Sequence, residues 1–262
     1  MSRISRPTPL HWFIAFLGCM SGCPALAGSS RLPQGHWEVV QVAVDHGDQP
    51  HWMHAPDDPR LLGRQLDIGS AGIRLDDDSR PCRKPVLTAL RRVSLQRFVG
   101  SRYPRPPAFD TPVRPTLADF RLRLADGPVT PLQLACTPGD APWNGAWFVM
   151  ASGGRLLTGY DNGGEVLVLR RRGPHDPVRA SFACTKARGA TEQAICASAA
   201  LAGYDRSVAA AYRRALQQAG DEAGPIRQAQ RRWVIARNAC GADAGCLVGR
   251  MRERIEQLMQ LP

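Results

Sequence analysis

The sequence predicts an α+β fold with an N-terminal antiparallel β barrel followed by a small, disulfide-stapled, all-α helical hairpin domain. Three observations predict this architecture. Short runs that alternate apolar and polar residues, separated by turn residues, fill the chain up to residue 172. From residue 180 onward, apolar residues recur at spacings of three and four and proline nearly disappears. The chain also holds six cysteines beyond residue 27, an even number that suits disulfide bonds.

Length and composition narrow the class of protein. The chain has 262 residues, of which 44% are hydrophobic and 22% charged, which is typical of one large or two ordinary globular domains. Its formal charge of +11 permits a polyanionic partner without requiring one, because drift in a GC-rich coding sequence also enriches arginine. Beyond the first thirty residues no apolar run is long enough to span a bilayer, so a multi-spanning membrane protein is excluded.

The first 27 residues have the layout of a secretory signal peptide. Arg3 and Arg6 precede the apolar stretch 12–20, and Ala25-Leu26-Ala27 supplies the small-residue exit. Export to the periplasm is therefore expected, where nucleic acid is an improbable partner. A second interpretation treats Cys23 as the lipidated residue of a lipoprotein, but the sequence before it matches such a signal less well.

Residues 32–173 are expected to form the antiparallel β domain, as a barrel or a sandwich. A hairpin is predicted around the turn 69–71, and a second one around Asp161-Asn162-Gly163-Gly164. The predicted strands are 37–44, 65–68, 72–75, 120–124, 132–136, 146–150, 155–160 and 165–169. The proline-rich segment 103–115 is predicted to be a loop that covers a barrel mouth or connects strands.

The opening of the first strand, Gly35-His36-Trp37, resembles the start of a lipocalin-type barrel. In that family the tryptophan closes one end of the barrel. The resemblance implies a barrel that holds a small or lipidic ligand, with the helices as a docking element. This is the alternative function that the sequence leaves open.

A short linker, 174–179, separates the β domain from the helical domain 180–262. Ser198 is expected to cap a helix that stops at Gly220, and Pro225 is expected to start the next helix. The predicted apolar stripes are Leu201, Tyr204, Asp205, Val208, Tyr212, Ala215, Leu216 and Ala219 on the first helix, Ile226, Ala229, Trp233, Ala236, Arg237 and Cys240 on the second, and Leu247, Met251, Ile255 and Leu258 on the third.

Asp205 and Arg237 are the charged residues that fall on these apolar stripes. If the first two helices form an antiparallel hairpin, the two side chains face one another. The sequence therefore predicts a structural ion pair between them, in which each charge is strongly destabilising without its partner.

The helical half resembles the LprI-type lysozyme-inhibitor-like domain of exported bacterial proteins. The matching residues include Leu201, Tyr212 and Trp233 of the expected motif core. They also include Phe182-Ala183-Cys184, Thr191-Glu192-Gln193-Ala194-Ile195-Cys196, Asp205, Gln230-Arg231-Arg232-Trp233, Arg237-Asn238-Ala239-Cys240, Cys246-Leu247 and Arg254-Ile255. The resemblance implies a non-enzymatic envelope protein that binds and inhibits lysozyme-type cell-wall hydrolases. Because C-type lysozymes are themselves basic, the positive charge of this domain opposes such binding at low ionic strength.

The cysteines are expected to pair as disulfides. Cys82 and Cys136 are the only cysteines of the β domain and are expected to bond to each other. In the helical domain, the local pairs Cys184–Cys196 and Cys240–Cys246 are favoured, and crossed pairing stays open.

Other candidate sites are weaker. His46, His51 and His54, with Asp45 and Asp48, have metal-ligand chemistry but more resemble a solvated loop, and Asp76-Asp77-Asp78 resembles the solvated end of a hairpin strand. No metal or cofactor is therefore expected. Common catalytic motifs are missing, so an enzyme is disfavoured. Arg91-Arg92 and Arg170-Arg171-Arg172 suit an anionic envelope polymer, or a solvated strand edge that discourages aggregation.

Overall fold

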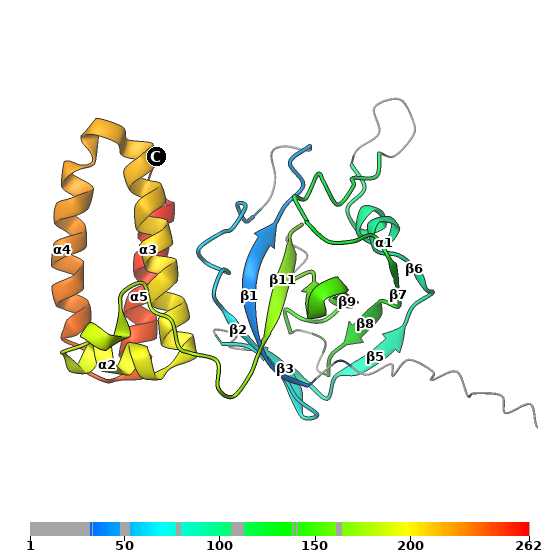
Figure 1. Ribbon diagram of the computed structural model, residues 1–262, viewed down its shortest axis with the longest axis horizontal. Coiled ribbons are helices and arrows are strands. Elements are labelled where there is room, and N and C mark those ends of the chain that lie inside the picture. The colour runs from blue at the N-terminus through cyan, green and yellow to red at the C-terminus, as the bar shows by residue number, and fades with distance from the viewer. Residues whose placement is uncertain are drawn as a thin grey trace, which may run out of the picture.

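A curved antiparallel sheet of nine strands fills the N-terminal part of this computed structural model, and a group of helices follows it (Figure 1). The structure describes residues 32, 34–47, 53–76, 80–105, 113–137, 139, 141–160 and 164–261. The predicted signal peptide and the tight turn at 161–163 lie outside the described residues.

The strands run antiparallel in the order β4-β3-β2-β1-β11-β10-β9-β8-β5. Their bounds are β1 Gly35–Ala43, β2 Gln65–Ile68, β3 Gly72–Leu75, β4 Cys82–Arg83, β5 Val86–Ala89, β8 Leu132–Ala135, β9 Trp147–Ala151, β10 Arg155–Thr158 and β11 Val166–Arg172. Two short strands, β6 Val93–Ser94 and β7 Pro128–Val129, form a separate ladder. The prediction of an antiparallel barrel-like sheet is confirmed.

The two end strands of this sheet are joined by the chain itself. Only Lys84 and Pro85 separate β4 from β5, and Lys84 adopts a positive φ of 45°. The backbone N–H of Thr137 donates to the carbonyl of Arg83 at 3.1 Å. A disulfide between Cys82 and Cys136 adds a covalent bond between β4 and the end of β8. These links bring the two ends of the nine-stranded sheet together and give it a barrel-like curvature.

Large side chains from every part of the sheet fill its interior. Trp37, Trp143 and Phe148 are at most 1% exposed, and they pack with inward-facing aliphatic residues of β2, β3, β10 and β11. Small barrels are commonly filled in this way by their own side chains. Trp37 thus lies inside the barrel-like sheet. The lipocalin resemblance implies a similar buried position, in which the tryptophan closes one end of the barrel.

A second apolar layer covers the outer face of β9, β10 and β11. Alternation along β11 sends Leu167 and Leu169 into the interior, whereas Val166 and Val168 pack outside, against helix α1, Leu95–Arg102. Three central strands are therefore buried on both faces. Helix α1 was not predicted, because its eight residues are too few to show a helical period.

The strand predicted at 120–124 is wrong. This segment is a turn, in which the N–H groups of Arg121 and Leu122 donate to the carbonyls of Ala118 and Leu117. Phe120 and Leu122 are buried beneath α1 and so produce an alternating pattern without a strand. Burial at every second residue of a turn mimics the pattern of a strand.

The helical unit, residues 180–261, contains helices α2 Ala190–Ala197, α3 Ala199–Ala219, α4 Gly224–Asn238 and α5 Ala244–Met259. The Ser198 hydroxyl accepts from the N–H of Leu201, and Gly220 ends α3 with a positive φ of 51°. Helices α3 and α4 run antiparallel, as predicted (Figure 1). Across the described residues, no helix combines the length and apolar character that a membrane crossing requires.

The main partner of α3 is α5, not α4. Leu247, Met251, Ile255 and Leu258 of α5 are at most 2% exposed against α3. On α4 the expected stripe is only half-buried, Ala236 is exposed, and Arg237 alone is fully buried. The periodicity of α4 correctly predicted a helix but overstated its burial, because α5 occupies most of the apolar face of α3.

The helical unit docks on the sheet unit through two glycines. Helix α3 approaches the loop before β2 so closely that a Cβ on Gly203 would lie 2.2 Å from the carbonyl oxygen of Gly63. Beside this contact, the Ser207 hydroxyl donates to the Leu62 carbonyl at 2.7 Å and accepts from Arg64 at 3.1 Å. The Arg64 guanidinium is fully buried and lies 3.2 Å from the centre of the Tyr204 ring.

A buried carboxylate, Glu38 of β1, completes this junction. It lies opposite Arg170 in the β1–β11 ladder and accepts a hydrogen bond from Arg170 at 2.8 Å. Arg206 of α3 also donates to Glu38, and Arg172 lies 3.6 Å away. The expectation that residues 170–172 form a solvated strand edge is wrong, because β11 is a central strand and two of these arginines pair with Glu38.

We predict that Gly203→Ala destabilises the protein. The new Cβ must push α3 away from the Gly63 carbonyl, and such overpacking lowers the free energy of unfolding by about 1–3 kcal/mol. Gly249→Ala on α5 is the matched control, because nothing lies within 4 Å of its added Cβ. The control should stabilise by up to about 1 kcal/mol through helix propensity. Urea unfolding measures both, and equal stabilisation by the two variants would contradict the close contact.

Candidate functional site

A buried ion pair lies at the centre of the helical unit. The Arg237 guanidinium on α4 donates to the Asp205 carboxylate on α3 at 3.3 Å, and both side chains are less than 10% exposed. Asp205 also accepts from the backbone N–H of Ser181 at 2.6 Å. Burial lowers the pKa of Arg237, and Asp205 opposes this effect. The pair joins α3, α4 and the segment that enters the helical unit.

Residues of the predicted family motif surround this pair. Arg237 lies 5.5 Å from the centre of the Trp233 ring and donates to the Asn238 side chain. The Trp233 indole N–H donates to the Arg250 carbonyl on α5 at 3.3 Å. Leu201 is 4% exposed, while Tyr212 and Trp233 are half-buried at the edge of the same core. Through these contacts the motif residues hold α4 against the neighbouring helices.

Both disulfides of the helical unit lie at one end of the helices. Cys184 is bonded to Cys196 and Cys240 to Cys246, the local pairing that the sequence favoured. The Thr191 hydroxyl, 3% exposed, bridges the two stapled segments, with the Gly241 carbonyl at 2.8 Å and the Asn238 carbonyl at 3.2 Å. We name the segments 184–189 and 240–246 the disulfide end. Two covalent bonds and a buried hydroxyl fix its backbone.

The disulfide end and the opposite tip of the helical unit differ in charge. Lys186 and Arg188 are exposed at the disulfide end, whereas Asp243 caps α5 by accepting from the N–H of Cys246 at 2.9 Å. The opposite tip, between α3 and α4, exposes Asp221 and Glu222. The disulfide end therefore carries two exposed basic side chains and one exposed carboxylate, Asp243, whereas the tip at the other end of α4 exposes two carboxylates.

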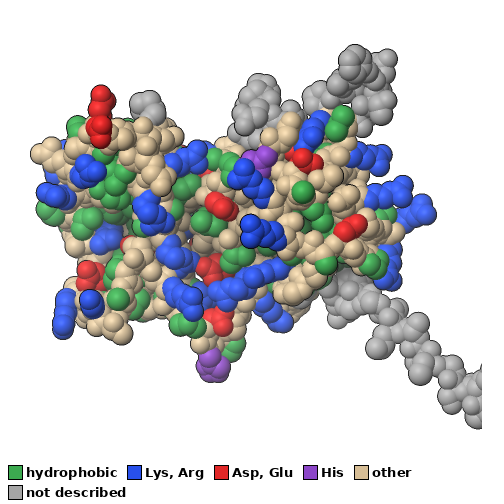
Figure 2. All heavy atoms as spheres, turned by 45° about the horizontal axis from the view of Figure 1, so that its top comes forward, with side chains coloured by type: hydrophobic (Ala, Val, Ile, Leu, Met, Phe, Trp, Pro, Cys, Tyr) green, Lys and Arg blue, Asp and Glu red, His purple; other side chains and the backbone are tan. Residues whose placement is uncertain are grey.

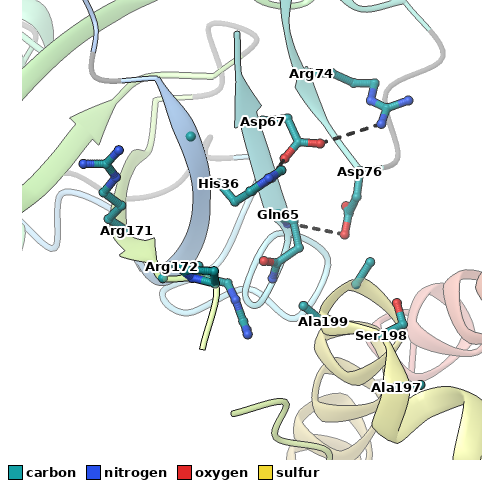
Figure 3. Close-up of a pocket in the computed structure, with 14 residues that line it drawn as sticks. His36, Gln65, Asp67, Arg74, Asp76, Arg171, Arg172, Ala197, Ser198 and Ala199 are labelled. Carbon is teal, nitrogen blue, oxygen red and sulfur yellow. Dashed lines mark hydrogen bonds and ion pairs between the residues drawn. The ribbon is translucent and has the colours of Figure 1, made fainter. Parts of the chain in front are cut away.

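An open pocket of about 790 Å³ lies between the sheet and the start of α3 (Figure 3). His36 of β1 and Asp67 of β2 point toward one another in Figure 3, with 2.5 Å between Nδ1 and Oδ1, and Arg74 lies 3.7 Å from the same carboxylate. Arg172 points toward the α3 side, whereas Arg171 points away from it. The pocket thus carries both signs of charge.

Basic side chains gather along this boundary between the helices and the sheet (Figure 2). Burial lowers the pKa of Arg206. The carboxylate of Glu38 raises this pKa, whereas the positive charges of Arg64 and Arg172 lower it further. Because Glu38 pairs with three arginines here, the junction is an ion-pair network that joins the two units. Its carboxylate is already fully engaged, so the network stabilises the docking rather than offering a site for chemistry.

The histidine cluster does not form a metal site within the described residues. Asp45 receives two 2.6 Å hydrogen bonds from Arg105, while His54 lies 3.2 Å from the buried carboxylate of Glu165. Asp48 and His51 lie outside the described residues, as do Asp77 and Asp78. Asp76 is half-buried and accepts from the backbone of Gln65 at 3.3 Å, so it is part of the hairpin and not simply its solvated end.

Sequence reasoning missed the residues that dock the two units. Glu38 and Arg206 are 168 residues apart, and neither follows a recognisable motif. The one available signal was Glu38 itself, a charged residue in a mostly apolar strand. No comparable signal marked Gly63 and Gly203, because a close backbone contact is not visible in a sequence.

We predict that Asp205→Asn lowers the free energy of unfolding by about 3–5 kcal/mol, since it leaves Arg237 buried without its counter-charge. Glu253→Gln is the matched control, because its pair with Arg250 at 3.7 Å is more than half exposed and contributes little. Urea unfolding of both variants tests the pair. Similar losses for the two variants would show that Asp205–Arg237 behaves like a surface ion pair.

Among the comparisons with known proteins, one family model matches, and it covers the helical unit. Searches of curated proteins and of solved structures return no match for this chain. Residues 184–258 match the family model described as "Lysozyme inhibitor LprI". The match starts at the first cysteine of the disulfide end and stops within α5, so it covers both disulfides and the Asp205–Arg237 pair. The C-terminal third of this chain is thus similar to the LprI lysozyme-inhibitor family.

Proposed function

We propose that this protein is an exported, non-enzymatic envelope protein that binds and inhibits lysozyme-type cell-wall hydrolases. The observation that carries the proposal is the family match over residues 184–258, which coincides with the disulfide-stapled helices. The inferred organisation is a signal peptide at 1–27, a β domain at 32–173, a linker at 174–179 and an inhibitory domain at 180–262.

The disulfide end is the surface that we assign to the hydrolase. An inhibitor that occupies an active-site cleft gains affinity when its contact loops are rigid before binding, because little conformational entropy is then lost. Here the two segments are held by Cys184–Cys196, by Cys240–Cys246 and by the Thr191 hydroxyl between them. The α3–α4 tip has no such covalent support among the described contacts.

Charge supports the same surface. Most glycoside hydrolases work with a pair of carboxyl groups that flank the scissile bond, so their clefts carry local negative charge. The exposed Lys186 and Arg188 complement such a cleft even if the rest of the hydrolase surface is basic. The two basic side chains attract the acidic cleft at short range. The repulsion between the two cationic proteins as a whole acts at longer range, and salt screens it.

The compartment and the chemistry agree with an inhibitor. All six cysteines in the described part of the chain are bonded in disulfides, which persist in oxidising compartments and leave no thiol nucleophile among them. Periplasmic export through residues 1–27 is the location that we propose, with lipid anchoring at Cys23 as the alternative.

The alternative function, binding of a small or lipidic molecule inside the barrel, has less support. The interior of the described sheet is occupied by Trp37, Trp143, Phe148 and their aliphatic neighbours. A ligand would have to displace this packed core, which costs several kcal/mol.

We predict that the protein lacking residues 1–27 inhibits lysozyme on a cell-wall substrate with saturation near one to one. The double variant Lys186→Ala/Arg188→Ala should weaken inhibition by about tenfold or more, since it removes charge-assisted contacts with the cleft. The apparent inhibition constant, titrated at physiological salt against chicken-, goose- and invertebrate-type enzymes, is the measurement.

Asp221→Ala/Glu222→Ala at the acidic tip is the matched control, because it also changes two exposed charges of the same unit. This control should inhibit like the unaltered protein. If the tip variant loses inhibition and the disulfide-end variant retains it, the assigned surface is wrong. If the unaltered protein inhibits none of the three enzymes, the proposed function itself fails.

A further inference from the structure

A pocket of about 390 Å³ beside α1 is lined by four arginines and by no acidic residue. Its remaining lining is apolar or neutral. The lining residues are Leu90, Arg91, Val93, Arg97, Phe98, Ser101, Arg102, Arg114 and Gln133. We name it the arginine bay. It lies on the sheet unit and involves none of the residues assigned to hydrolase binding.

Several other arginines of the sheet unit are paired with carboxylates. Arg105 pairs with Asp45 and Asp119, Arg60 with Asp58, and Arg170 with Glu38 and Asp176. By contrast, none of the arginines of the bay forms an ion pair among the residues that the structure describes. Four like charges around one hollow repel each other, and a bound anion would relieve that repulsion.

The deepest of the four side chains is held in place. Arg102 is half-buried, donates to the Gln133 side chain and lies 5.2 Å from the centre of the Phe98 ring. Gln133 is itself fixed, since its amide donates to the Ala146 carbonyl at 3.2 Å. The buried Nε of Arg102 has no hydrogen-bond partner in the described structure. An oriented guanidinium in the lining of the bay is suited to an oxyanion.

The floor of the bay adds an apolar surface. Phe98 is 6% exposed, and Leu90 and Val93 are half-buried beside it. Arg91, Arg97 and Arg114 are exposed around them. The backbone is close-packed here, because a Cβ on Gly100 of α1 would lie 2.6 Å from the Pro115 carbonyl oxygen. The bay therefore combines a rigid apolar floor with a cationic rim.

We propose that the arginine bay binds the phosphoryl group of an anionic molecule whose apolar part rests on Phe98, Leu90 and Val93. Arginine forks match the oxygens of a phosphoryl group, and a hollow lined by one sign of charge concentrates such anions. A phosphate-bearing lipid headgroup and a free phosphorylated small molecule share this chemistry. The site is independent of hydrolase inhibition.

The test measures binding of two probes to the protein lacking residues 1–27. Inorganic phosphate is titrated by calorimetry, and vesicles of phosphatidylglycerol are compared with vesicles of phosphatidylcholine by co-sedimentation. The variant Arg97→Gln/Arg102→Gln/Arg114→Gln should weaken binding of the preferred probe by about tenfold or more, as expected for losing charge-assisted hydrogen bonds. Its fold is checked by its disulfide content and by circular dichroism, and Arg102→Lys serves as a milder second variant.

A variant with the same loss of charge elsewhere is the control. Arg227→Gln/Arg231→Gln/Arg232→Gln removes three exposed arginines from α4 and should leave binding unchanged. Saturable phosphate binding that is lost only in the bay variant supports a free phosphorylated ligand. Phosphatidylglycerol binding lost only in the bay variant supports a lipid headgroup. Equal losses in the two triple variants, or no binding of either probe, would overturn the proposal.

Discussion

The buried carboxylate of Glu38 is the interaction on which the arrangement of the two units depends. It pairs with Arg170, Arg172 and Arg206, and it joins two strands of the sheet to α3. Without it, three guanidinium groups and the buried Arg64 would repel one another across the junction. This attraction acts beside the close contact of Gly63 with Gly203 and stabilises the same junction.

Helix α3 connects this junction to the part of the helical unit that we assign to hydrolase binding. This helix is buried along most of its length, against the sheet on one side and α5 on the other. Asp205 on the same helix holds Arg237 and thereby positions α4, while Thr191 of α2 ties the two stapled segments together. The disulfide end is thus supported by a core and is not a free loop. A rigid surface of this kind is what an inhibitor of a preformed cleft requires.

Much of the fold could be predicted from the sequence, because local patterns determine it. The strands at 65–68 and 72–75, the Ser198 cap and the Gly220 stop depend on neighbours within a few residues, and the structure has each of them where predicted. The pairing of Asp205 with Arg237 followed from helix periodicity together with the register of a hairpin. Predictions failed where distant residues decide burial. Phe120 and Leu122 are buried by α1, and the charge of Arg170 is neutralised by a strand far away in the sequence.

The candidate site was less predictable than the fold. The family motif located the helical unit, and the helix register placed Cys196 near Cys240 and Cys246, but no pattern indicated that Lys186 and Arg188 are exposed at that end. Only the pair Arg91-Arg92 indicated the arginine bay in the sequence. Its other arginines lie in α1 and in the segment after α1. Surfaces assembled from separate segments become visible only in three dimensions.

The central claim is that the disulfide end is the surface that a lysozyme-type hydrolase covers. Hydrogen–deuterium exchange of the protein, with and without saturating lysozyme, measures this directly. The account predicts slower exchange in segments 184–189 and 240–246 and unchanged exchange at 220–222 and around α1. Slower exchange confined to the acidic tip or to the sheet unit, or no change anywhere at saturating lysozyme, would contradict it.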